Sequence, residues 1–144
     1  MRATPEVLKS TDLFSELSLE DCQRIVERSG SRQVDGGHTF TVQGVSDPNL
    51  QLIIDGSADV FVHDRLVRAL SVGDYFGEVS LLDNAPRSAT IVAGDQGCTT
   101  LLIPQLAFWE IVDAHPHVTR PLMRGLATRL RHAEDALWAE RGSG

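Results

Sequence analysis

The stretch that decides the fold is FGEVSLLDNAPRSATIV, residues 76–92. Gly77 precedes Glu78 and a short apolar segment that predicts one helical turn, and Arg87 follows before the small residue Ser88. Arginine presents a planar fork of donors that suits a phosphate, and a glycine removes the Cβ that would block close approach. A carboxylate beside a phosphate is repelled unless it accepts a hydrogen bond from another group, such as a sugar hydroxyl. We call the Gly77–Glu78 side and the Arg87–Ser88 side of this stretch its two limbs. Together they predict a site for a ribose phosphate.

The same residues allow a second interpretation on physical grounds alone. Glu78 and Arg87 have opposite charges, and on a surface loop they would simply pair with each other, which contributes under ~1 kcal/mol. The rest of the sequence has to decide between a ligand site and a surface ion pair.

Composition limits the classes of protein to which the chain can belong. Its 144 residues fit one domain, predicted over residues 1–144 with a core at about 13–138 and a tail or linker at 139–144. Hydrophobic residues make up 42% and charged residues 23%, as in soluble proteins. The net charge of −7 argues against a domain that binds nucleic acid or an anionic membrane. No signal peptide and no apolar run of ~20 residues is present, so we expect a cytoplasmic location.

Cysteine and histidine give no sign of a metal site or of catalysis. Cys22 and Cys98 lack the spacing of metal ligands and are expected to be reduced thiols, as is usual in the cytosol. A metal-binding cupin roll would need a His-x-His pair, and His38 has no second histidine at that spacing. No Ser/His/Asp or Cys/His set can be placed together. We therefore predict no enzyme activity and no metal.

The first and middle parts of the chain differ in hydrophobic period. After the capping residue Ser18, apolar residues recur at helical spacing to Val26. From Arg32 the period becomes two, and short strand-like segments follow one another. Turn signals separate these segments, among them Asp35-Gly36-Gly37, Gln43-Gly44, Asp55-Gly56 and Val72-Gly73-Asp74. This arrangement predicts a mainly β protein, a sandwich, jelly roll or roll, with flanking helices.

The period becomes helical again after Pro104. A first helix ends at His115-Pro116, and a second is predicted from about residue 118 to 138. The second carries one apolar stripe, made of Leu122, Leu126, Leu130, Ala133 and Leu137. Such a stripe must be buried, so it either lies back on the β-roll or pairs with a second copy as a coiled coil. Both arrangements stay open from the sequence.

The opening stretch and the residues just before it resemble a segment of a known family. Residues 73–82, GDYFGEVSLL, followed by PRSAT at 86–90, resemble the phosphate-binding cassette of cyclic nucleotide-binding domains. That family includes the catabolite activator protein and the regulatory subunits of cAMP-dependent kinase. Residues 37–44 resemble its strand and glycine turn, residues 50–62 its strand–Gly–strand hairpin, and residues 126–130 its C-terminal helix. The resemblance implies an antiparallel, jelly-roll-like β-roll with N-terminal helices and a long C-terminal helix.

The resemblance also implies roles for single residues. Glu78 would accept a hydrogen bond from the ribose 2′-hydroxyl, and Arg87 would pair with the cyclic phosphate. Gly77 would allow the ligand to approach closely, while Val60 and Leu70 would form apolar walls. The full set of expected ligand-binding residues is Gly77, Glu78, Val79, Arg87, Ser88, Ala89, Val60, Leu70 and Arg131.

The C-terminal helix departs from the family pattern. Where the catabolite activator branch has a hydroxyl pair that holds adenine, this chain has Ala133 and Glu134. Arg131, His132 and Glu134 are polar candidates on the same turns, with a solvated helix face as the other interpretation for each. Some relatives that select cGMP have a threonine after the cassette arginine. Ser88 stands there in this chain and favours cAMP.

The predicted function is that of a regulatory or sensor domain without catalysis of its own. It would bind cAMP, with cGMP as the second choice, and switch a partner or fused effector through its C-terminal helix, which would also hold a homodimer together. No helix-turn-helix segment follows that helix, so we expect a stand-alone bacterial sensor or one domain of a larger enzyme, transporter or regulator. The alternative function is a degenerate domain that serves as a dimerisation or docking module without nucleotide.

Overall fold

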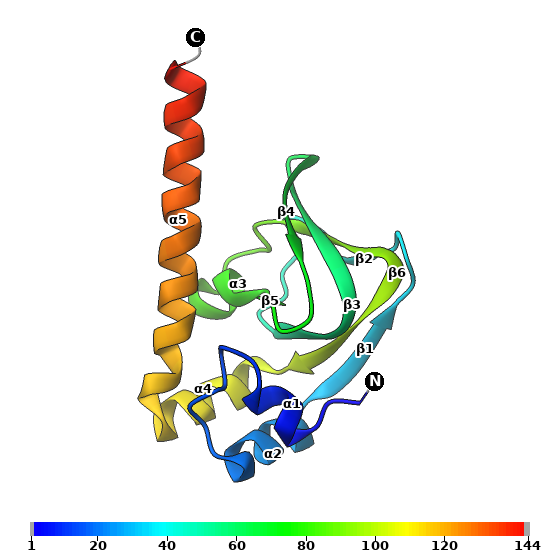
Figure 1. Ribbon diagram of the computed structural model, residues 1–144, viewed down its shortest axis with the longest axis vertical. Coiled ribbons are helices and arrows are strands. Elements are labelled where there is room, and N and C mark those ends of the chain that lie inside the picture. The colour runs from blue at the N-terminus through cyan, green and yellow to red at the C-terminus, as the bar shows by residue number, and fades with distance from the viewer. Residues whose placement is uncertain (1, 143–144) are drawn as a thin grey trace.

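Side-chain caps start the two N-terminal helices. In the computed structural model, which describes residues 2–142, the Thr4 side chain accepts a hydrogen bond from the N–H of Val7 at 3.2 Å and begins α1. Ser18 Oγ accepts from the N–H of Asp21 at 3.1 Å and begins α2, as predicted. Both helices lie with α4 at one end of the sheet (Figure 1).

The strands form one antiparallel sheet that curls into a roll (Figure 1). Over the described residues the strand order is β1-β6-β3-β4, while β2 also pairs with β6 and β5 with β3. The predicted fold class, a β-roll with N-terminal helices and a long C-terminal helix, is confirmed. The elements in chain order are α1 (Pro5–Lys9), α2 (Leu19–Arg28), β1 (Gly30–Val34), β2 (Thr39–Thr41), β3 (Leu50–Val62), β4 (Arg65–Leu70), β5 (Tyr75–Phe76), α3 (Glu78–Asp83), β6 (Thr90–Ile103), α4 (Gln105–Ala114), η1 (Pro116–Val118) and α5 (Thr119–Gly142).

One long strand replaces the two that a turn signal predicted. Asp55-Gly56, predicted as a turn, lies within β3, where the register with β6 shifts and Gly56 has a φ of 80°. A Cβ on Gly56 would lie 2.2 Å from the carbonyl oxygen of Gly97 in β6. The glycine therefore permits an irregular, close crossing of two strands and does not end the strand. The hairpin turns instead at His63 and Asp64, which both have positive φ.

Two apolar clusters hold the roll and the helices together. One lies inside the roll, where the rings of Phe40 and Phe76 meet edge to face with centroids 5.4 Å apart. The other joins the helices to β3 and β6 and includes Phe14, Phe108 and Leu122, each 1% exposed. Because Leu122 belongs to α5, the second cluster fixes the start of that helix against the rest of the domain.

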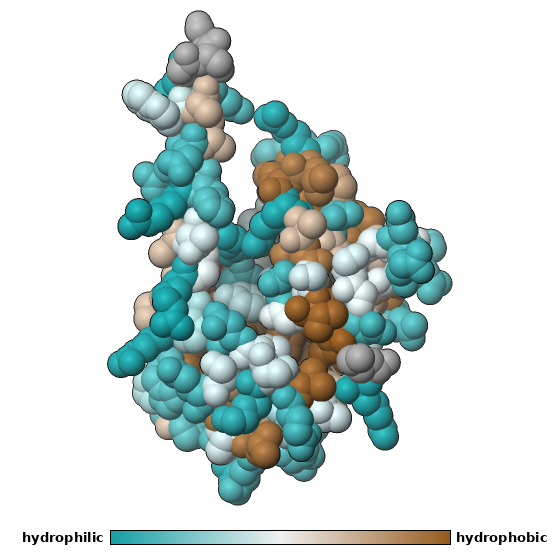
Figure 2. Space-filling view, viewed as in Figure 1, coloured by the Kyte–Doolittle hydropathy of each residue, from teal (hydrophilic) through white to brown (hydrophobic). Residues whose placement is uncertain are grey.

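The rest of α5 leaves the roll after this anchor. Leu126 is half-buried, but Leu130 and Leu137 of the predicted stripe are 61% and 55% exposed. Figure 1 shows this part of α5 standing apart from the roll, and Figure 2 shows apolar side chains at the tip of the β3–β4 hairpin, across a gap from the helix. Arg65 at the hairpin and Glu140 of α5 form an ion pair at 3.7 Å. The stripe is thus divided between the domain's own core and solvent.

Other sequence predictions concern the chain end, membranes, metals and thiols. The predicted tail begins inside α5, which continues to Gly142, and residues 143–144 lie outside the described part of the chain. No helix within residues 2–142 is both long and apolar enough to cross a membrane. In the same range, no group of three His, Cys, Asp or Glu side chains is arranged to hold a metal ion. Cys22 and Cys98 are free and buried, and burial raises the pKa of both thiols.

Candidate functional site

Gly77 joins β5 to α3 in a conformation and a space that suit only glycine. Its φ is 92°, in the left-handed region. A Cβ there would lie 2.2 Å from Arg87 Nη1 and 2.5 Å from the carbonyl oxygen of Asn49. The missing side chain therefore makes room for the Arg87 guanidinium, whereas the prediction from sequence was room for the ligand.

Arg87 carries its charge into the interior with only part of its hydrogen bonding satisfied. The residue is 4% exposed. Its Nη2 donates to the carbonyl oxygen of Asn49 at 2.9 Å and lies 3.2 Å from Asp47 Oδ2. Its Nε and Nη1 are buried and have no hydrogen-bond partner among the described residues. Burial lowers the pKa of Arg87, and the carboxylates of Asp47 and Glu78 act in the opposite direction.

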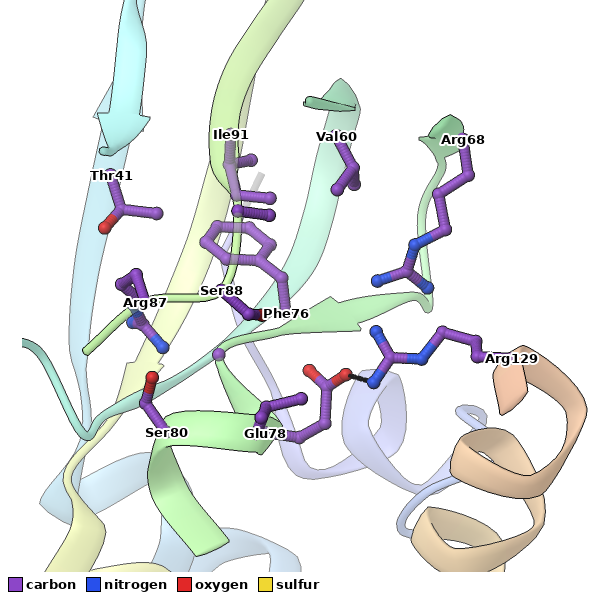
Figure 3. Close-up of a pocket in the computed structure, with 13 residues that line it drawn as sticks. Thr41, Val60, Arg68, Phe76, Glu78, Ser80, Arg87, Ser88, Ile91 and Arg129 are labelled. Carbon is purple, nitrogen blue, oxygen red and sulfur yellow. Dashed lines mark ion pairs between the residues drawn. The ribbon is translucent and has the colours of Figure 1, made fainter. Parts of the chain in front are cut away.

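Glu78 forms the other limb of the pocket and is tied to the C-terminal helix. The residue is 3% exposed, and its carboxylate forms an ion pair with Arg129 of α5, drawn as the dashed line in Figure 3. The Arg129 side chain is 29% exposed, so this pair is largely shielded from water. The carboxylate predicted to accept a hydrogen bond from a sugar hydroxyl therefore also contacts α5.

A second arginine stands at the same end of the pocket. Arg68 of β4 extends toward Arg129, and both guanidinium groups lie beyond Glu78 as seen from Arg87 (Figure 3). Burial lowers the pKa of Arg68, and the positive charge of Arg129 lowers it further. Burial, with a smaller contribution from Glu78, raises the pKa of the neighbouring Tyr75 to about 12. This end of the pocket is thus crowded with positive charge around one carboxylate.

Most of the residues predicted for the site lie around this one pocket. Their places are set by β3, by β5 with the first turn of α3, and by the segment that leads into β6. The predicted residues that line the pocket are Val60, Gly77, Glu78, Val79, Arg87, Ser88 and Ala89.

The structure does not bring Leu70 and Arg131 to the pocket. Leu70 packs in the cluster inside the roll at 5% exposure, and Arg68, two residues earlier on the same face of β4, lines the pocket. Arg131 is exposed. It follows Arg129 by two positions, and two helical positions turn about 200°, so the two side chains leave opposite faces of α5. Neither side chain lines this pocket.

Sequence reasoning missed Arg68, Arg129 and Ser80. For Arg129 a signal was present, because it follows Leu122 by seven positions and Leu126 by three and so shares their helix face. For Arg68 the signal was the alternation of β4, which puts it on the face of the buried Leu70. Nothing in the sequence marked Ser80, since serine is common near the start of a helix.

Comparison with curated proteins places these residues in a family. The model of the cyclic nucleotide-binding domain matches residues 31–115. A cAMP-dependent protein kinase regulatory subunit from Debaryomyces hansenii is 30% identical over 108 residues, which are 74% of this chain and 24% of that protein. The Pycsar effector protein PaPycTIR from Pseudomonas aeruginosa is 32% identical over 114 residues, 78% of this chain and 37% of that protein. The chain therefore spans well under half the length of either relative.

A solved structure agrees with this assignment. The catabolite activator protein of Thermus thermophilus superposes with a TM-score of 0.78 and 30% identity, and the match covers 88% of this chain and 62% of that one. The family match is to a binding domain and not to a catalytic one, in agreement with the prediction that the chain is not an enzyme. The family resemblance predicted from the cassette is confirmed: the chain belongs to the cyclic nucleotide-binding domain family.

Proposed function

We propose that this chain binds a 3′,5′-cyclic nucleotide, with cAMP preferred, and passes the binding event to a partner or fused effector through α5. The observation that carries the proposal is the buried Arg87 guanidinium with two unpartnered donor atoms, on the limb opposite the buried Glu78 carboxylate. Opposite charges held apart in one pocket suit a ligand that has an anionic end and a hydroxyl end.

The anionic end of such a ligand belongs at Arg87. A buried guanidinium costs free energy unless hydrogen bonds and an opposite charge satisfy it. Asp47 supplies one carboxylate, but its side chain is 26% exposed, so water screens part of the attraction. A phosphate offers several acceptor oxygens around one atom and would satisfy Nε and Nη1 together. Ser88 and Ala89, which follow on the same limb, would add a hydroxyl and backbone N–H groups.

The hydroxyl end belongs at Glu78. A carboxylate has two oxygens and accepts several hydrogen bonds, so Glu78 would accept the ribose 2′-hydroxyl while it stays paired with Arg129. Val60 and Ile91 provide apolar surface above this position (Figure 3). The ribose and base would therefore lie between the cassette, the roll and α5.

The charge of the pocket favours an anion in a chain that is acidic as a whole. The charged side chains that line the pocket are three guanidinium groups, those of Arg68, Arg87 and Arg129, and one carboxylate, that of Glu78. The whole chain carries −7. A local positive field in a negative molecule directs small anions to the pocket, although the domain would repel polyanions. Ser88 after Arg87, and the cAMP-dependent regulatory subunit among the relatives, favour cAMP as the ligand.

Calorimetry with cAMP and cGMP tests this proposal through Arg87. We expect the wild-type chain to bind cAMP, and Arg87→Ala to weaken binding by about 1.5–3 kcal/mol, the value of a hydrogen bond to a charged group. Arg131→Ala is the matched control, because Arg131 is an exposed arginine outside the pocket. If nucleotide-free protein gives no binding heat with either cAMP or cGMP, the result would favour the docking module over the sensor. Equal affinities of the Arg87 and Arg131 variants would place the phosphate elsewhere.

The path from the pocket to an effector runs through α5. Glu78 pairs with Arg129 on that helix, and the Tyr75 hydroxyl would lie 2.9 Å from a Cβ at Gly125, so α5 passes closely over the cassette at this level. Beyond Arg129 the helix is exposed to Arg141. A ligand shifts the position of α5 only if its affinity differs between two positions, and its contact with Glu78 provides such a difference.

Tryptophan fluorescence tests this path, because Trp138 lies on α5 and is 77% exposed. In a Trp109→Phe background, which removes the second tryptophan, we expect saturating cAMP to change the emission of Trp138. Arg129→Ala should abolish the change at nucleotide concentrations that still saturate the site, because the link between Glu78 and α5 is lost. An emission change of full size in the Arg129 variant would contradict this path.

The exposed part of α5 has a surface that suits a second copy of the chain. Met123, Leu130 and Leu137 are 57%, 61% and 55% exposed and lie seven residues apart. A repeat of seven is the spacing with which two helices pack as a coiled coil. We therefore assign the homodimer expected from the sequence to this row of α5, which lies beside the Leu122 and Leu126 face that contacts the roll.

Sedimentation of Leu130→Asp tests the assignment. Leu130 is exposed within one chain, so the change should leave the fold intact, but a charge in the row should convert a wild-type dimer to monomer. Thr128→Asp is the control, because Thr128 is also exposed and lies two positions away on another face. A wild-type monomer, or a dimer that survives Leu130→Asp, would remove this row from any interface.

A further inference from the structure

A serine on the first turn of α3 has a hydroxyl that the protein leaves without a partner. Ser80 is 1% exposed and lines the pocket, and its Oγ makes no hydrogen bond within the described part of the chain. Four buried side-chain N and O atoms in the described residues share this condition. Three of them, Ser80 Oγ with Nε and Nη1 of Arg87, belong to residues of this pocket.

The hydroxyl cannot use either of the usual ways to satisfy a buried serine. One way is a hydrogen bond to water, but Ser80 is only 1% exposed and has almost no contact with solvent. Helical serines commonly donate back to the carbonyl four residues earlier, but no such bond joins Ser80 to Phe76. The contrast with Ser88 is informative, because Ser88 is exposed and its hydroxyl is therefore open to solvent. An alanine at position 80 would fill nearly the same space without a buried polar atom, so the hydroxyl lowers the stability of the chain unless a ligand uses it.

The direction of the hydroxyl shows which part of a ligand it would meet. In Figure 3 Ser80 points up from α3 toward the guanidinium of Arg87, on the side of the pocket away from Arg129 and Arg68. Ser80 and Arg87 therefore approach the same space from the two limbs. One group with acceptor oxygens pointing in several directions, such as a phosphate, satisfies both, whereas a single carbonyl or hydroxyl does not.

We propose that Ser80 Oγ donates a hydrogen bond to an oxygen of the phosphate that Arg87 binds, so that the anion is held from the α3 limb as well as from the Arg87–Ser88 limb. This inference rests on the proposed function, since the phosphate is that of the cyclic nucleotide. It makes Ser80 a positioning residue that fixes the orientation of the two free phosphate oxygens in the pocket.

Ser80→Ala tests the proposal with two measurements, because it should raise the melting temperature and lower the affinity for cAMP. Without nucleotide, loss of an unsatisfied buried hydroxyl should raise the melting temperature, by about 2–4 °C for a chain of this size. In calorimetry the same variant should bind cAMP about tenfold to a hundredfold more weakly, as expected when a hydrogen bond to a charged group is lost. Ser80→Cys, whose thiol is a weak donor of similar size, should fall between wild type and Ser80→Ala.

Two further measurements separate a contact with phosphate from a general effect on α3. Leu82→Ala changes an exposed residue of the same helix that does not line the pocket, and its affinity for cAMP should match wild type. The Rp and Sp phosphorothioates of cAMP replace one free oxygen at a time. Ser80→Ala should weaken one diastereomer more than the other, because Oγ reaches one oxygen.

The outcomes distinguish this inference from the proposed function. A wild-type chain that binds no cyclic nucleotide overturns both. If the wild type binds and Ser80→Ala binds with equal affinity, only the role of Ser80 is overturned. A lower melting temperature for Ser80→Ala also overturns it, since the hydroxyl would then have a partner inside the protein.

Discussion

The rest of this structure depends on one constraint, which is that a guanidinium is buried although two of its donor atoms have no hydrogen-bond partner among the described residues. Arg87 is 4% exposed and is held by one carbonyl oxygen, that of Asn49, and one carboxylate, that of Asp47. Its position requires Gly77 to have no side chain. Its backbone is fixed as well, because its N–H donates to Val45 and its carbonyl oxygen accepts from Gly44. Burial of these unpaired donors lowers the free energy of unfolding of the ligand-free chain, and it leaves the donors available to bind an anion.

The pocket and the C-terminal helix are joined by an ion pair between two oppositely charged side chains. Glu78 is too deeply buried to remain without a counter-charge, and Arg129 of α5 provides it. The apolar anchor at Leu122 holds the start of the helix, whereas its second half has little contact with the roll. The helix is packed at its start, and it forms ion pairs with Glu78 near its middle and with Arg65 of the β3–β4 hairpin near its end. Of these contacts, the pair with Glu78 is the one that lies in the pocket, so a change at Glu78 acts directly on α5. Binding and response thus share one carboxylate.

The fold and most of the pocket could be predicted from the sequence because both depend on local chemistry. The period of two, the cap at Ser18 and the glycine-bounded cassette are properties of neighbouring residues, and the structure has the corresponding elements. Two kinds of error arose where the outcome depends on distant parts of the chain. Gly56 looked like a turn because its crossing with Gly97 in β6 cannot be seen in a local pattern. Arg131 was named and Arg129 was not, because the face of α5 that meets the cassette is set by tertiary packing.

The most direct test of this account is the side-chain NMR signal of Arg87, observed in protein labelled with ¹⁵N-arginine and assigned through Arg87→Lys. Its Nε–H has no partner among the described residues, so addition of cAMP should shift this signal downfield and slow its exchange with water. Arg131, which is exposed, should show no change. If cAMP binds while the Arg87 signal keeps its position and exchange rate, the anion is held elsewhere, and the central claim that Arg87 is buried for the phosphate is wrong.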